Sequence, residues 1–103
     1  EVTRLHADLC SALADPTRIL LLYALVEKPR TVNDLSSEVS IRQPAASRHL
    51  KVLRERGLVF TERQGTVITY HLADRRVIEA MDLLRSAMRD RLNQRASLVN
   101  KLG

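Results

Sequence analysis

The most constraining feature of this sequence is a change in the spacing of its apolar residues at Gly57. Before this glycine, Ala46, Leu50 and Leu53 recur every three or four residues, which is the period of a helix with one buried face. After it, LVFTER and TVITYHL flank Gln64-Gly65, and Val67, Thr69 and His71 alternate with Ile68, Tyr70 and Leu72, which is the period of a strand. Helical spacing returns near Asp74. This order predicts a mainly helical fold that carries one β-hairpin.

Composition limits the size and the setting of this fold. With 103 residues, 45% of them hydrophobic, the chain is expected to form a single domain over residues 1–103. Only 3% of the residues are aromatic, so Leu, Val and Ala must fill the core, which favours helices. The single cysteine excludes an intrachain disulfide, and no apolar run is long enough to span a bilayer. We therefore expect a cytoplasmic protein with no membrane partner.

Capping residues and prolines predict where the helices begin and end. Asp15 followed by Pro16 is typical of a helix start, and the helix continues through TRILLLYALV until Pro29 ends it. Regularly spaced leucines predict an earlier helix over about residues 2–14. Thr31 is placed to cap a third, short helix.

The third helix and the next one form a recognisable pair. They are expected over Thr31–Ser37 and Gln43–Arg56, with Pro44 in the first turn of the second and a tight turn between them. A two-stranded hairpin, turning at Gln64-Gly65, follows at once. This is the pattern of a winged helix-turn-helix, with the order α-α-α-α-β-β-α.

The second helix of the pair carries hydrogen-bonding and basic side chains opposite its apolar stripe. In a helix-turn-helix, this helix enters the major groove of double-stranded DNA with its N-terminal residues against the base edges. Gln43, Ser47 and Arg48 are placed for base contacts, because Gln and Arg can bind adenine and guanine edges through two hydrogen bonds. Lys51 and Arg54 lie further along and are expected to meet phosphate.

Flanking residues extend this predicted DNA surface. Arg42 and Pro44 stand at the start of the helix, and Arg63 stands beside the hairpin turn, within reach of phosphate or the minor groove. Between residues 42 and 63 there are six Arg or Lys and two Glu, in a chain whose net charge is +5. This concentration favours a DNA-binding surface over an ordinary solvated helix face.

The last helix is expected over about residues 75–100 and is too long for one small domain to cover. At 1.5 Å per residue it would measure about 40 Å, and an apolar stripe runs along it. A second subunit would cover that stripe together with the leucines of the first helix. The predicted interface residues of this homodimer are Leu5, Leu9, Leu13, Met81, Leu84, Met88 and Leu92.

Three segments of the chain resemble the ArsR/SmtB family of bacterial winged-helix repressors. They are LADPTRILLLYAL, TVNDLSSEVSIRQPAASRHLKVLRERGLV and QGTVITYHL, and the resemblance covers about residues 5–90. It implies a homodimer joined through its first and last helices, which binds an operator and represses transcription until a signal arrives. It also implies that Gln43, Ser47 and Arg48 contact DNA. One departure is Arg42, where members often have a serine, so a hydroxyl cap is absent.

The metal sites that the resemblance implies are incomplete in this sequence. The thiolate site needs a Cys-x-Cys in the third helix, where this chain has TVNDL. The last-helix site pairs an Asp and a His of one protomer with a His and a further His or Glu of the other. Asp74 matches the first ligand and Asp90 could replace the last, but Arg76 and Ala87 stand at the two positions where imidazoles are expected. We therefore expect no metal at these sites, and no cofactor; the inducer cannot be read from the sequence.

Cys10 leaves alternatives open. It can be a small residue buried in the dimer interface, a thiol sensor, or, with His6 one helical turn earlier, half of a metal site completed by a partner subunit. A winged helix used only for protein contacts is the main alternative to a DNA-binding regulator. An enzyme is not expected, because Ser47 and His49 are two residues apart on a helix and face different ways.

Overall fold

The computed structural model describes residues 2–102, and its elements follow the predicted order with one addition. The helices are α1 (Val2–Ala12), α2 (Pro16–Glu27), α3 (Val32–Val39), α4 (Gln43–Glu55) and α5 (Arg75–Leu102), and the strands are β1 (Arg30–Thr31), β2 (Val59–Gln64) and β3 (Val67–Leu72). The strand that was not predicted is β1. The expected boundaries shift by at most two residues, since α3 continues to Val39 and α4 ends at Glu55.

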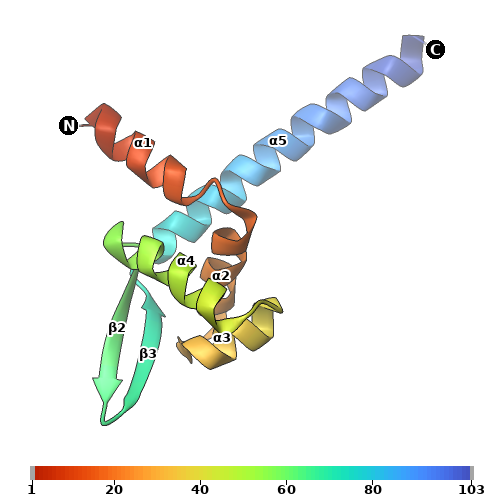
Figure 1. Cartoon of the computed structure of the whole chain (residues 1–103). Helices are drawn as coiled ribbons and strands as arrows, with labels where there is room; N and C mark the ends of the chain where they lie inside the picture. The colour runs from red at the N-terminus through yellow and green to blue at the C-terminus, as the bar shows by residue number, and fades with distance from the viewer. Residues whose placement is uncertain (1, 103) are drawn as a thin grey trace.

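The elements form a small helical body with three projections (Figure 1). Helices α2, α3 and α4 make the body, the β2–β3 hairpin projects from it, and α1 and α5 diverge on the other side (Figure 1). The structure measures 63 × 36 × 21 Å, and α5 accounts for much of its length. No single helix within residues 2–102 has the length and apolar content to cross a membrane; only α1 and α2 together do, and they meet at a bend of 89°.

The core consists mainly of leucine, as the composition predicts. Leu50 and Leu53 of α4 are fully buried, together with Ala46, so the predicted apolar stripe is confirmed. Burying one such leucine contributes about 1.5–3 kcal/mol relative to leaving it exposed. The other buried apolar residues are Ala12, Leu21, Leu22, Leu25, Leu35, Leu58, Val59 and Ile78. The exposed side of α4 is therefore fixed by how its other side packs.

The predicted caps and turns are also confirmed. Asp15 caps α2, since its Oδ1 accepts a hydrogen bond of 2.8 Å from the backbone N–H of Thr17. The side chain of Thr31 caps α3 by accepting from the N–H of Asp34. Gly57 and Gly65 have φ angles of 75° and 62°, the left-handed conformation that glycine adopts without strain. These residues set the ends of α4 and of the hairpin.

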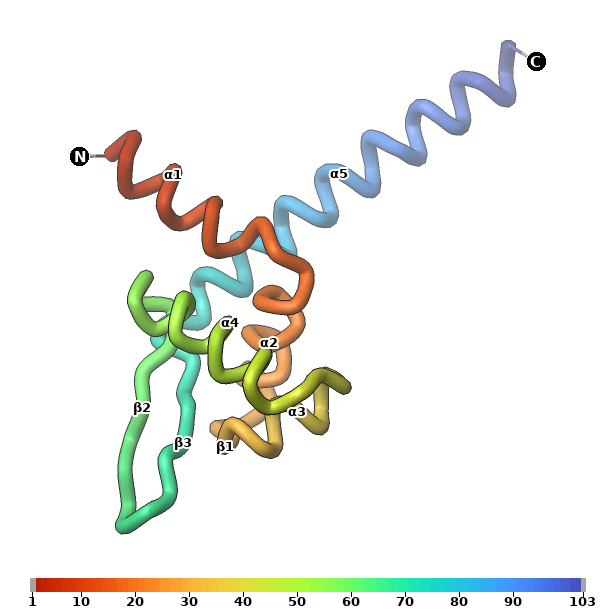
Figure 2. Tube along the Cα trace, in the orientation of Figure 1, coloured from red at the N-terminus to blue at the C-terminus, as the bar shows by residue number. Residues whose placement is uncertain are grey.

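The unpredicted strand β1 joins the wing to the helical body. Its two residues pair with β3, Arg30 opposite Tyr70 and Thr31 opposite Thr69, which gives an antiparallel sheet of order β1-β3-β2. Figure 2 shows β1 between the end of α2 and the start of α3. Two residues are too few to display an alternating pattern, so periodicity alone does not reveal this strand.

Candidate nucleic-acid interface

Helix α4 turns one face to the core and the other to solvent. Gln43, Arg48, Lys51 and Arg54 are exposed, and Ser47 is half-buried at the edge of the packed face. Within residues 2–102, no hydrogen bond or ion pair engages the side chains of these five residues. Donors that are not committed to the protein are free to bind an outside partner.

The start of α4 lacks a side-chain cap. Arg42 occupies the N-cap position with extended backbone angles (φ −71°, ψ 146°), and its side chain makes no capping hydrogen bond. This confirms the effect expected from having arginine in place of serine. Pro44 sits in the first helical turn, and Arg42 and Pro44 are both exposed. The positive end of the α4 dipole is therefore open beside a cation, an arrangement that favours anions.

Arg63 stands near the tip of the wing, as expected. It is exposed, and its Nε donates a hydrogen bond of 3.0 Å to the backbone oxygen of Gly65 in the turn. This bond holds the side chain at the tip through one of its five N–H donors. Arg63 lies opposite Ile68 in the β2–β3 ladder, and the hairpin points away from α1 and α5 (Figure 1).

Two contacts tie α4 to the N-terminal part of the chain. Arg56 lies 3.7 Å from Asp8 of α1, so one of the six cations counted between residues 42 and 63 is already paired. Arg18 of α2 donates to the backbone oxygen of Ala12 at 2.6 Å, and its Nη1 lies 3.4 Å from Nδ1 of half-buried His49. These contacts connect α4 to α1 and α2.

Helix α5 carries a second concentration of positive charge, for which the sequence pattern predicted no role. Between residues 75 and 102 there are seven Arg or Lys and three Asp or Glu. Beyond residue 81 the whole helix is exposed, and it runs away from the hairpin (Figure 1). Local charge excess therefore does not distinguish α4 from α5; only the packing of α4 beside the wing does.

Grooves lie between α1, α2 and α5. The larger, of about 460 Å³, is lined by Cys10, Leu13, Ile19, Tyr23, Met81, Leu84 and Arg85, and a second, of about 390 Å³, lies between α1 and the start of α5. Of the seven predicted interface residues, Leu9, Leu13 and Met81 are half-buried against the core. The other four are exposed, namely Leu5, Leu84, Met88 and Leu92. Cys10 is exposed on α1.

A polar cluster stands beside the larger groove. The hydroxyl of Tyr23 donates to Oδ1 of Asp82 at 2.5 Å, and Arg85 donates to the same oxygen at 2.8 Å. The Arg85 guanidinium also lies 5.3 Å from the centre of the Tyr23 ring, a cation–π contact. Burial, followed by the hydrogen bond to Asp82, raises the pKa of Tyr23. These contacts fix α5 to α2.

Asp74 and Arg76 form a close ion pair at the start of α5. Nη2 of Arg76 lies 2.7 Å from Oδ2 of Asp74, and Nε lies 3.1 Å from both carboxylate oxygens. The hydrogen bonds from the Arg76 side chain, with a further bond from its backbone N–H, lower the pKa of Asp74 from 3.8 to about 2. A guanidinium thus lies where a metal bound to Asp74 would have to approach, and the residues present do not fit the metal site that the resemblance implies.

Replacing Arg76 with alanine is expected to raise the pKa of Asp74 towards 3.8, without reaching it, since the backbone N–H of residue 76 still donates to the carboxylate. Because the folded-state pKa lies below the unfolded value, this carboxylate stabilises the fold above about pH 4, and the contribution is lost as the pH falls towards 2. Carboxyl ¹³C NMR titration measures the shift, with Arg75→Ala as the neighbouring control. An Asp74 pKa that stays near 2 in Arg76→Ala would contradict this cause.

Within residues 2–102 of one protomer, no three His, Cys, Asp or Glu side chains lie close enough to hold a metal ion together. His6 and Cys10 share α1 and are both exposed. That they form half of a metal site completed by a second subunit stays a prediction.

Comparison with known proteins identifies the relatives of this chain. Residues 15–61, from α2 into β2, match the model of the bacterial regulatory protein family arsR. The HTH-type transcriptional regulator Rv0081 of Mycobacterium tuberculosis is 33% identical over 100 residues, which cover 96% of this chain and 88% of that protein. The chain belongs to the arsR family. The HTH-type transcriptional repressor SmtB and regulator NmtR of the same species are 39% and 40% identical to this arsR-family chain, which spans 55% and 63% of their lengths.

Solved structures agree with the fold of this arsR-family chain. The crystal structure of Rv0081 has a TM-score of 0.81 at 32% identity and covers 92% of this chain and 96% of its own. The solution structure of Mb0332 from Mycobacterium bovis, described as a homodimeric winged helix-turn-helix DNA-binding domain, has a TM-score of 0.79 at 26% identity and covers 90% and 86%. The predicted winged helix-turn-helix is therefore confirmed. These relatives are named as regulators, in agreement with the expectation of a protein that is not an enzyme.

Proposed function

We propose that this chain is a repressor of transcription that binds a DNA operator as a homodimer in the cytoplasm. The observation that carries the proposal is the exposed face of α4, where the side chains of Gln43, Arg48 and Lys51 make no hydrogen bond or ion pair within residues 2–102. The opposite face of α4 is locked into a leucine core, so this surface is rigid and presented as a unit. Some relatives in the arsR family are named as transcriptional repressors, and the exposed face of α4 in this chain suits the DNA binding that repression requires.

The proposed division of labour follows from position along α4 and the wing. Gln43, Ser47 and Arg48 lie in the N-terminal half of α4, the part of a recognition helix that meets base edges. Lys51 and Arg54 lie further along and bind phosphate in this proposal, as does Arg42 at the uncapped helix start. Pro44 fixes the first turn, and Arg63 brings the wing tip to a neighbouring phosphate or the minor groove.

The proposed dimer rests on the apolar surface of α1 and α5. Leu5, Leu84, Met88 and Leu92 each expose more than half of their side-chain surface in the single chain. Leu84 lines both grooves between α1, α2 and α5, whose other lining residues are mainly apolar and which a second copy would cover. The relative Mb0332 is itself described as homodimeric.

A salt series of DNA titrations tests the function. The chain is expected to bind duplex DNA from the region upstream of its own gene more tightly than random duplex of equal length. Both affinities are expected to fall with salt, by about 0.9 in log–log slope for each phosphate that the protein neutralises. Fluorescence anisotropy measures both. An absence of duplex binding at low salt, with the chain folded by circular dichroism, would support the alternative of a module for protein contacts.

Zinc, nickel and cobalt are expected not to release the operator through Asp74 or α3. The Arg76 guanidinium is hydrogen-bonded to the carboxylate of Asp74, and the segment TVNDL at the start of α3 contains no cysteine. The measurement is operator affinity with one metal equivalent per protomer, for the chain and for Asp74→Ala. A metal that abolishes binding by the chain but not by Asp74→Ala would overturn this prediction. A response lost only in Cys10→Ser would instead support the alternative of sensing through α1.

A further inference from the structure

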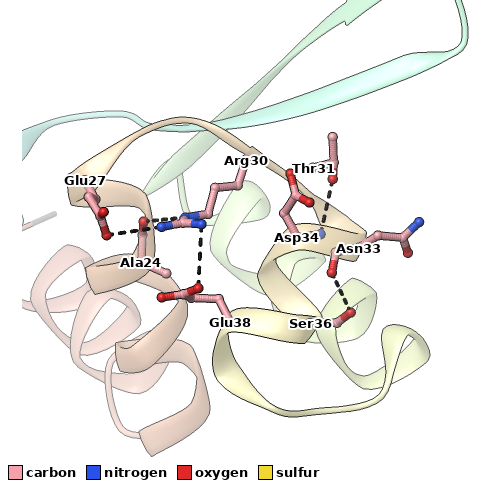
Figure 3. A network of polar contacts seen from close by, with 8 residues as sticks. All are labelled: Ala24, Glu27, Arg30, Thr31, Asn33, Asp34, Ser36 and Glu38. Atoms are coloured by element: carbon pink, nitrogen blue, oxygen red, sulfur yellow. Dashed lines mark hydrogen bonds and ion pairs between the residues drawn. The ribbon is translucent and has the colours of Figure 1, made fainter.

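Arg30 is the one charged residue in the buried set within residues 2–102, and it has no part in the proposed DNA surface. Its side chain is only 9% exposed. Its Nε donates to the backbone oxygen of Ala24 at 3.0 Å, and its Nη2 lies 3.1 Å from Oε2 of Glu27, both in α2. Its Nη1 lies 3.7 Å from Oε2 of Glu38 in α3. Figure 3 shows the guanidinium spanning the two helices.

The backbone of the same residue holds the wing. Arg30 pairs with Tyr70 of β3 in the sheet, and Thr31 pairs with Thr69. The side chain of Thr31 caps α3 (Figure 3). A strand of two residues thus joins the wing to α2 and α3, and α4 packs on both of those helices. The wing is also connected to the body at its base, where the chain turns at Gly57, Leu58 and Val59 are buried in the core, and β2 packs on α4.

The energetics of this cluster favour a role in orientation. A buried arginine has to be desolvated, so replacing such an ion pair with an apolar side chain of similar volume often leaves stability unchanged or higher. Glu27 and Glu38 are 73% and 51% exposed, so water can solvate them when Arg30 is absent. What an apolar residue cannot replace is the planar fork of donors, which reaches α2 and α3 at once.

We propose that Arg30 is a positioning residue that sets the angle of the wing relative to the recognition helix α4, so that both engage one DNA duplex together. It touches no DNA. It acts through β1 on the wing and through Glu38 on α3. This inference rests on the proposed DNA-binding function.

The test is a double-mutant cycle with the wing tip. Arg30→Met is expected to lower operator affinity by roughly 3- to 30-fold. It is also expected to flatten the salt dependence by about 0.9 for each phosphate that the wing no longer reaches, as Arg63→Ala does. Because the wing is already displaced, adding Arg63→Ala to Arg30→Met should cause little further weakening. Lys28→Met is the matched control, since it removes one exposed positive charge two residues away and should retain wild-type affinity.

Measurements are made well below the melting temperature of each variant, so that every chain is folded. Glu38→Gln removes the negative charge on the α3 side of the cluster and should give a smaller change of the same kind, so it tests the inference if Arg30→Met does not fold. Arg30→Lys should recover affinity only in part. If folded Arg30→Met binds the operator like the wild type, or if its effect adds fully to that of Arg63→Ala, the inference is wrong. If the wild type binds no duplex at all, the proposed function itself fails.

Discussion

Met88→Glu is expected to convert the dimer to a monomer and to weaken operator binding by roughly 10²–10⁴-fold. Met88 is exposed on the apolar stripe of α5, so a carboxylate there leaves the isolated chain intact but places a charge in the proposed apolar interface. Two linked half-sites gain affinity because the second binding event is intramolecular, and a monomer does not have that gain. Sedimentation at micromolar concentration measures the mass, and titration with operator DNA measures the affinity.

Leu83→Glu is the matched control for this change. Leu83 is 74% exposed on the same helix, and at 3.6 residues per turn it lies about 140° around the helix from Met88. It should therefore leave both the mass and the operator affinity close to those of the wild type. A Met88→Glu variant that remains a dimer and binds operator normally would show that another surface joins the protomers.

Arg48→Ala is expected to weaken operator binding by about 1–3 kcal/mol per half-site while changing binding to random duplex far less. Arg48 is exposed in the N-terminal half of α4 and forms no ion pair within residues 2–102, so its guanidinium can make two hydrogen bonds to a guanine edge. Removing it should leave the melting temperature nearly unchanged, since the side chain is exposed. Titration of operator and random duplex at several salt concentrations gives the affinity ratio.

Arg63→Ala supplies the contrast, because Arg63 lies at the wing tip, where phosphate or minor-groove binding is expected. It should weaken binding to operator and random duplex by similar factors. It should also flatten the salt dependence by about 0.9 in log–log slope for each phosphate that is no longer neutralised. An unchanged operator-to-random ratio in Arg48→Ala would mean that α4 does not read bases through this residue.

The elements that could be predicted from the amino-acid sequence are those whose pattern is local. The apolar stripe of α4 is visible because residues that recur at the helical period must share a face, and all of its members are buried. The caps at Asp15 and Thr31 and the left-handed glycines at 57 and 65 are equally local, since each is set by hydrogen bonds or steric limits within a few residues. The exposed face of α4 followed directly, as the complement of the buried one.

Which charged side chains are paired and which are free depends instead on how the folded elements pack together. In the sequence, Arg56 and Arg48 contribute equally to the positive charge between residues 42 and 63. In the structure, Arg56 lies 3.7 Å from Asp8 of α1, nearly fifty residues earlier in the chain, whereas Arg48 has no such partner within residues 2–102. Strand β1, in which Arg30 pairs with Tyr70, likewise depends on a segment of the wing about forty residues later. Periodicity reports which side of an element faces inward, because that depends on the element alone. Periodicity does not predict which side chains from distant parts of the sequence contact that element, because those contacts depend on how all the elements pack together.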